Sequence, residues 1–233
     1  MSVDEKAIEE AAQTARHYLD QIFLEPLSEL GLLLKDKISF WRFKNQINTV
    51  LKARNFLERK GIRPESIKSN FLPETVIPLL EAASETSDDT LSDMFAGLLA
   101  SALNPGTKET MHPAYAKVLA QLSPLDAVIL KDLYFSVLST SQSLDLEKPP
   151  ENYNLHQPPH RQLGIEPKSL PDPSGPSEQE MMLSFQNIKR LGIGDEGYDP
   201  LSRMNQAKRL CLTDFGMSFM KACTQNLPTD QAS

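Results

Sequence analysis

The sequence predicts a mainly α-helical protein: a stacked helical core followed by a small winged-helix-like C-terminal part with a short β-hairpin. Three observations predict this class. Apolar residues recur at three- and four-residue spacing through the first 138 residues, which is the period of a helix. Gly, Pro, Ser and Asp stand at the ends of these segments, where helices start and stop. Near the C-terminus the order becomes helix, loop, strand and helix, as in a winged helix.

The chain divides by composition into four parts. We expect a helical core over residues 1–138, which includes a long basic helix over residues 27–61. Residues 139–177 hold eight of the 17 prolines and few apolar residues, so they predict a linker or a long surface loop. The winged-helix-like part follows at residues 178–224, and residues 225–233 form a tail. With 233 residues, 40% of them hydrophobic, the chain can bury a substantial core.

The basic helix follows a first helix expected over residues 4–24, and it is expected to end at Gly61, because glycine favours helix C-termini. Its apolar stripe also carries Asp36 and Arg54. These charged side chains need partners if the stripe is buried. The apolar members of the stripe are Phe40, Phe43, Ile47, Val50, Leu51 and Leu57.

Two further helices are expected over residues 73–85 and 87–104. Ser87 is the predicted N-cap of the second helix, with Asp88 and Asp89 in its first turn, where acids suit the helix dipole. The apolar face of this second helix comprises Leu91, Phe95, Leu98 and Ala102. Small residues on the same helix would let another helix approach closely: Ala96, Gly97, Ala100 and Ser101.

The next two helices start near prolines. Pro113 is expected at the first helical position of one of them. Ser123, Pro124 and Asp126 are expected at the N-cap, the first and the third position of the other. The apolar stripe of that second helix comprises Leu125, Ile129, Leu133 and Val137.

The C-terminal part begins with a helix that closes near Gly192. Residues 194–206 are expected to form a loop, and "KRLCL" at 208–212 a short strand. Thr213 is the predicted cap of a last helix. The first of these helices would be the recognition helix of a winged fold, and Lys189 and Arg190 stand near its end. Its apolar residues are Met181, Phe185, Ile188 and Leu191.

The sequence lacks the familiar catalytic signatures. It contains no GxxxxGK[ST], GxGxxG, GxSxG or HExxH motif, so we expect no enzyme activity and no cofactor. Only two of the four histidines, His156 and His160, are close together, and they stand in the Pro-rich segment, so no metal site is expected there. His112, which precedes Pro113, is expected at a helix entry.

Acidic residues gather where the helices over 73–85 and 87–104 meet. No Lys or Arg occurs from residue 74 to residue 94. Acids are favoured at a helix N-terminus, and the alternative is a divalent-metal site of a metal-dependent enzyme. The cluster comprises Glu81, Glu85, Asp88, Asp89 and Asp93.

Cysteine usage and hydropathy place the protein in the cytoplasm. Two cysteines, Cys211 and Cys223, in so long a chain favour a reducing compartment. The segment after Met1 is acidic, unlike a secretory signal. The longest apolar runs reach about half of the roughly 20 residues that a membrane span needs, so no transmembrane segment is expected.

Three segments carry a resemblance to a known family: "LPETVIPLLEAASETSDDTLSDMFAGLLASALNP", "HPAYAKVLAQLSPLDAVIL" and "LCLTDFGMSFMKAC". They resemble the abortive infection alpha (Abi-alpha) family of prokaryotic proteins, and "PLSELGLLLKDKISFWRFKNQI" is similar to the segment that precedes the family's core. The resemblance covers roughly residues 26–138 and 180–224. It implies antiviral defence, in which an infected cell stops growing before the phage matures. It supplies neither a reaction nor catalytic residues.

A basic stretch stands out in this acidic chain. Residues 35–63 hold nine Lys or Arg against two acids, whereas the whole chain carries a net charge of -7. The candidate residues for contact with an anionic partner are Lys35, Lys37, Trp41, Arg42, Lys44, Lys52, Arg59 and Lys60 here, with Lys189 and Arg190 in the C-terminal part.

Three interpretations of the basic stretch compete. The cations could pair internally with the acidic neighbouring helices, which adds little stability for each exposed pair. They could contact the phosphates of a nucleic acid while Trp41 stacks on a base. Or the helix could lie on an anionic membrane surface. The corresponding functions are a defence protein that acts by contact with a protein partner or by self-association, a nucleic-acid-binding regulator, and a membrane-surface effector.

Overall fold

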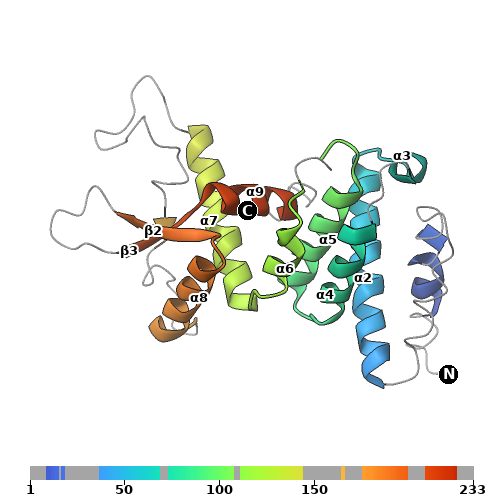
Figure 1. Ribbon diagram of the computed structural model, residues 1–233, viewed down its shortest axis with the longest axis horizontal. Helices are drawn as coiled ribbons and strands as arrows, with labels where there is room; N and C mark the ends of the chain where they lie inside the picture. Colours follow the sequence, from blue (N-terminus) through green and yellow to red (C-terminus); the bar gives the residue numbers. More distant parts are fainter. Residues whose placement is uncertain are drawn as a thin grey trace. The chain divides into compact units, whose positions relative to one another are not determined.

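The computed structural model describes residues 9–15, 17–18, 37–68, 73–107, 111–143, 164–165, 175–198 and 208–224. Helices dominate these residues, and the strands form one small antiparallel sheet (Figure 1). The prediction of a mainly α-helical fold with a short C-terminal hairpin is confirmed. The chain forms two compact units: unit 1 comprises residues 1–121 and 222–233, and unit 2 comprises residues 122–221.

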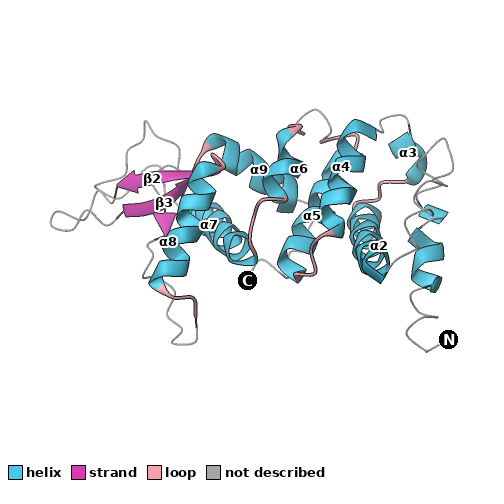
Figure 2. Cartoon of the chain, turned by 60° about the horizontal axis from the view of Figure 1, so that its bottom comes forward, coloured by secondary structure: helices cyan, strands magenta, loops and turns pink. Residues whose placement is uncertain are grey.

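Unit 1 is a stack of helices that lie side by side (Figures 1 and 2). Helix α2 packs against α4 and α5, and both of these pack against α6. Residues 9–15 and 17–18 are also helical. The helices are α2 (Lys37–Arg59), α3 (Pro64–Lys68), α4 (Pro73–Ser84), α5 (Asp89–Leu103) and α6 (Ala114–Leu119).

Helix α2 buries part of the stripe that its periodicity predicts, while Phe43 and Leu51 are half-buried. Ile47, Val50 and Leu57 are at most 5% exposed and belong to the core of unit 1. The part of the expected helix over residues 27–36, which includes Asp36, lies outside the described residues. The described part of α2 is therefore a core helix with one exposed side.

Gly61 ends α2 as predicted. Its φ of +69° is a left-handed conformation that only glycine adopts freely. The N–H of Gly61 donates to the carbonyl of Glu58 at 2.9 Å, and the N–H of Ile62 donates to the carbonyl of Leu57 at 3.0 Å. These two bonds form a Schellman motif, which satisfies carbonyls that the helix leaves unpaired.

The small face of α5 receives another helix, as predicted. Gly97 lies so close to the last turn of α9 (Asp214–Thr224) that a Cβ there would be 1.8 Å from the carbonyl oxygen of Cys223. The hydroxyl of Ser101 donates to the carbonyl of Ala222 at 2.6 Å. Ala222 and Cys223 belong to unit 1, so the chain's end completes the core that its first half begins.

Two predicted helix starts are each wrong by one residue. Asp88, and not Ser87, is the N-cap of α5, because the carboxylate of Asp88 accepts the N–H of Leu91 at 2.9 Å. Aspartate caps as well as serine does, so the sequence "SDD" offers adjacent candidates. Pro113 is the residue before α6 and not its first helical residue.

Unit 2 combines two helices with a three-stranded antiparallel sheet in the order β1-β3-β2. Figure 2 shows these strands in magenta. The helix α7 packs against α8 and β3, and α8 packs against β2. The first part of α9 also belongs to this unit. The elements are α7 (Pro124–Ser143), β1 (Gly164–Ile165), α8 (Glu178–Arg190), β2 (Gly194–Tyr198) and β3 (Lys208–Leu212).

The structure corrects the expected loop over residues 194–206, because residues 194–198 form strand β2. In the hairpin Gly194 pairs with Leu212 and Tyr198 with Lys208. A glycine-rich, acidic segment has low strand propensity, and pairing with the apolar strand β3 overrides it. The predicted strand at 208–212 is confirmed.

The segment expected as a linker over residues 139–177 also contains regular structure. Helix α7 continues through the expected boundary at residue 138 and ends at Ser143. Gly164 and Ile165 pair with Cys211 and Leu210 of β3.

The predicted cap of α7 is confirmed, and it has an additional partner. The N–H of Ser123 donates to Oδ2 of Asp126 at 2.8 Å, and the N–H of Asp126 donates to the hydroxyl of Ser123 at 3.2 Å. The side chain of Asn187 on α8 donates to the same carboxylate oxygen at 2.8 Å. The cap thereby joins α7 to α8.

Candidate binding site on helix α2

Two of the predicted contact residues pair with the acidic helices. Arg42 lies 3.3 Å from the carboxylate of Glu85. The ammonium of Lys52 lies 2.6 Å from the carboxylate of Asp93 and 3.2 Å from the hydroxyl of Ser92. Internal charge pairing therefore accounts for part of the basic stretch.

Of the other predicted basic residues of this stretch, some lie outside the described residues and the rest are on the surface. Lys35 lies outside the described residues, and so does the side chain of Lys37, although its backbone begins α2. Lys44 and Arg59 are exposed. Lys60 is also on the surface, and partial burial lowers the pKa of its ammonium.

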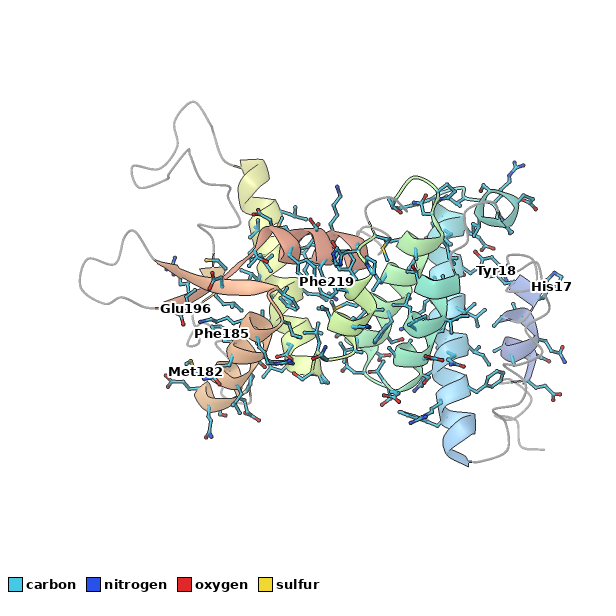
Figure 3. All side chains as sticks on the ribbon, viewed as in Figure 1. His17, Tyr18, Met182, Phe185, Glu196 and Phe219 are labelled. Carbon is cyan, nitrogen blue, oxygen red and sulfur yellow. The ribbon has the colours of Figure 1, made fainter. Side chains whose placement is uncertain are left out.

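Arg54, the charge on the apolar stripe, has partners. It donates to the carboxylate of Glu58 at 2.7 Å, and its guanidinium lies 5.4 Å from the ring centroid of Tyr18. Figure 3 shows Tyr18 on the side of the N-terminal segment that faces α2, with His17 pointing away. Burial first, and the charge of Glu58 second, raise the pKa of Tyr18 to about 12.

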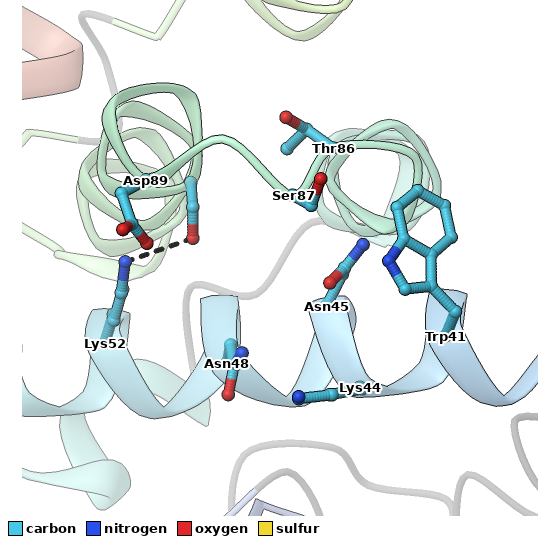
Figure 4. Close-up of a pocket in the computed structure, with 9 residues that line it drawn as sticks. Trp41, Lys44, Asn45, Asn48, Lys52, Thr86, Ser87 and Asp89 are labelled. Atoms are coloured by element: carbon cyan, nitrogen blue, oxygen red, sulfur yellow. Dashed lines mark hydrogen bonds between the residues drawn. The ribbon is translucent and has the colours of Figure 1, made fainter.

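Helix α2 also forms one wall of a pocket of about 340 Å³ in unit 1 (Figure 4). Trp41 lies at one end and is 41% exposed. Lys52 lies at the other end, and Asn45 and Asn48 lie between them. Lys44 is the fifth pocket residue of α2. Asn45 is held in place because its amide nitrogen donates to the carbonyl of Ser84 at 3.0 Å.

The opposite wall is the turn between α4 and α5 together with the start of α5. It contributes Thr86, Ser87, Asp89 and Ser92. The hydroxyl of Thr86 accepts the N–H of Asp88 at 3.3 Å, which fixes the turn beside the cap of α5. Apart from Trp41, every residue of the lining is of a polar or charged type.

The two basic residues predicted in the C-terminal part belong to unit 2 and have partners there. The ammonium of Lys189 lies 2.5 Å from the carboxylate of Glu196 on β2. The guanidinium of Arg190 donates to the side-chain oxygen of Asn187 at 2.8 and 3.2 Å. The first contact orients Lys189 towards the hairpin. The second joins Arg190 to Asn187, whose amide also bonds to Asp126 at the start of α7.

Three of the five residues of the acidic cluster have structural partners. Asp88 caps α5, while Glu85 and Asp93 pair with Arg42 and Lys52. Within the described ranges, no group of three or more His, Cys, Asp or Glu is arranged to hold a metal ion. His112 accepts the N–H of Ala114 through Nδ1 at 3.1 Å, as suits a helix entry.

Sequence reasoning found Trp41, Lys44 and Lys52 but missed the rest of the pocket. Asn45, Asn48 and the turn residues carry no motif, and they meet only because α2 packs against α4 and α5. His156 and His160 lie outside the described residues. No helix in the described part of the chain is long and apolar enough to cross a membrane.

Comparison with known proteins gives one family. The family model described as "Abortive infection alpha" matches residues 42–223, which is most of the chain. The match begins at α2 and runs through the Pro-rich segment to the end of α9. Neither the curated proteins nor the solved structures contain a significant match.

Proposed function

Because the chain belongs to the abortive infection alpha family, we propose that it serves in the cytoplasm as an anti-phage defence protein that acts by macromolecular contact and not by catalysis. The family's description suggests the defence role. The pocket face of α2 supports the contact role, because it combines a half-exposed tryptophan with exposed Lys44. A nucleic acid is the partner that this pairing of ring and cation suits.

Two alternatives have less support from the described residues. A membrane-surface helix needs a free apolar stripe, whereas Ile47, Val50 and Leu57 are buried within unit 1. A metal-dependent enzyme at the acidic junction needs free carboxylates, whereas Asp88 and Asp93 already have structural partners.

The C-terminal part adds a second contact to this proposal. The order α8, β2, β3, α9 matches that of a winged helix, whose recognition helix would be α8. Lys189 and Arg190 stand at the end of that helix.

The test is a plaque assay in cells that express the protein at equal levels. We expect Trp41→Ala with Lys44→Glu to lose phage restriction. Lys117→Glu, a charge reversal at an exposed position of α6, is the matched control and should keep it. Asp88→Asn with Asp93→Asn should also keep it. Asparagine caps helices as well as aspartate does, and the change at Asp93 removes only a partly exposed ion pair with Lys52.

The opposite pattern would support the enzyme alternative: restriction lost in the Asp88→Asn, Asp93→Asn variant and kept in the Trp41 and Lys44 variant. Thermal melts of each purified variant exclude loss through unfolding. Variants that melt within a few degrees of the parent give an interpretable result.

A further inference from the structure

The pocket beside Trp41 has the size of a small-ligand site. Its volume of about 340 Å³ lies at the lower end of the range of roughly 300–1,000 Å³ for ligand pockets. Tryptophan is usually well covered in a folded protein, yet Trp41 is 41% exposed at the pocket's end. A flat ring stacked on the indole would remove this apolar surface from water.

The amides between Trp41 and Lys52 suit a polar ring edge. Asn45 uses its amide nitrogen on the carbonyl of Ser84, so its Oδ1 is the acceptor that can face a ligand. Asn48 is exposed, and its amide offers both a donor and an acceptor. An asparagine beside a stacking surface is the arrangement that reads the edge of a nucleobase.

An exposed cation stands next to the stacking surface. With a rise of about 1.5 Å per residue, Lys44 is separated from Trp41 by about 4.5 Å along α2 and Lys52 by about 16 Å. Lys44 is exposed, whereas the ammonium of Lys52 is already paired with the carboxylate of Asp93 at 2.6 Å. We therefore assign the phosphate contact to Lys44.

We propose that this pocket binds a nucleoside phosphate, with the base stacked on Trp41 beside Asn45 and the phosphate bound by Lys44. The proposal rests on the proposed function, since it assigns a ligand to the same face of α2. Free mononucleotides and the ends of single-stranded RNA or DNA share this chemistry.

The intrinsic tryptophan fluorescence of the chain reports on this pocket, because Trp41 is the only tryptophan in the sequence. We would titrate the full chain with the four 5′-monophosphates, with nucleosides, with inorganic phosphate and with short 5′-phosphorylated single strands, following tryptophan fluorescence. Nucleoside phosphates should quench the emission in a saturable way. Inorganic phosphate should not, because it has no ring to stack.

Variants test which side chains make the site. Base stacking contributes about 1–3 kcal/mol, so Trp41→Ala should weaken binding roughly tenfold or more by calorimetry. Trp41→Phe should keep most of the affinity. Lys44→Glu should weaken binding roughly three- to tenfold and reduce its salt dependence, whereas Lys117→Glu should leave it unchanged.

Four outcomes decide the proposal. Saturable quenching by monophosphates supports it and identifies a free nucleotide, and quenching by single strands alone supports it and identifies a strand end. No saturable quenching by any probe overturns it. Binding that Trp41→Ala and Lys44→Glu leave unchanged also overturns it. If nothing binds while Trp41→Ala still abolishes phage restriction, the ligand assignment fails and the proposed function stands.

Discussion

Gly97 sets how closely α5 and the end of α9 approach each other in unit 1. An added Cβ would lie 1.8 Å from the carbonyl oxygen of Cys223, which is backbone and cannot move aside as a side chain could. The neighbouring hydroxyl of Ser101 then bonds to the carbonyl of Ala222. The absence of a Cβ at Gly97 therefore permits the close contact with the backbone of Cys223, and the hydrogen bond from Ser101 to Ala222 fixes the position of α9 along α5.

Gly97→Ala should lower the free energy of unfolding by about 1–3 kcal/mol. The clash outweighs the gain of about 1 kcal/mol in helix propensity that alanine brings. Urea unfolding of the full chain measures the change. Gly106→Ala is the control, because its Cβ would lie 3.4 Å from Oδ1 of Asn104. Equal effects at both glycines would show that the close approach is not the cause.

Tyr18 should make stability depend on alkaline pH. Its folded pKa of about 12 lies above the ordinary value of 10.0, so the folded state favours the neutral phenol. This stabilisation is fully present below pH 10 and is lost as the pH rises to about 12, at up to about 1.4 kcal/mol per pH unit.

Tyr18→Phe removes this dependence. The hydroxyl has no hydrogen-bond partner among the described residues, so the variant should cost little at neutral pH. Denaturant titrations of both proteins at pH 7, 10 and 11.5 give the comparison. If the free energies of unfolding of the parent and of Tyr18→Phe changed equally between pH 7 and pH 11.5, this would contradict the burial of the phenol.

At the level of single helices, the start of α5 gives a direct test. Asp88→Ala should cost about 1 kcal/mol because it removes the acceptor for the N–H of Leu91. Asp88→Asn and Ser87→Ala should each stay within about 0.5 kcal/mol of the parent. A larger effect from Ser87→Ala, measured by chemical unfolding, would restore Ser87 as the cap.

The two ion pairs that α2 makes with its neighbours should differ in strength. Lys52 and Asp93 are 32% and 19% exposed and 2.6 Å apart, whereas Arg42 and Glu85 are 51% and 65% exposed and 3.3 Å apart. Double-mutant cycles should give a coupling of about 1 kcal/mol for the first pair and about 0–0.5 kcal/mol for the second. The reverse order would mean that burial does not govern these pairs.

Local signals predicted the helices well. The stripe of α2, the glycine at its end and the cap of α7 each depend on residues a few positions apart. The glycine and the cap are confirmed, and so are three of the stripe's six apolar residues. Strand β2 was missed because its pairing with β3 comes from residues about fifteen positions away. The pocket could not be predicted, since its two walls come from segments about forty residues apart and no local pattern specifies which side chains meet.

At the scale of the whole molecule, charge is divided unevenly. The chain has a net charge of -7, yet residues 35–63 hold nine Lys or Arg against two acids. A polyanion is repelled at long range and attracted only at short range, so association should be slow but should still reach the pocket. A small nucleotide experiences less of this repulsion than a long strand does.

Unit 1 is discontinuous in sequence, and this gives a whole-chain prediction. A chain that ends after Lys221 lacks Ala222, Cys223 and Thr224, which are buried in unit 1. It should be less stable by about 2–4 kcal/mol through lost burial and the lost bond from Ser101. A chain that ends after Thr224 keeps every described contact of α9 and should match the parent in thermal melts.

The same discontinuity determines when unit 1 can finish folding during protein synthesis. The residues of α5 leave the ribosome more than a hundred residues before those that cover Gly97 and Ser101. Because nascent segments fold as they emerge, unit 1 stays incompletely closed until residues 222–224 have been synthesised. Synthesis that stops before α9 therefore yields no finished unit 1, and α2 is presented on a complete core only in chains that include α9.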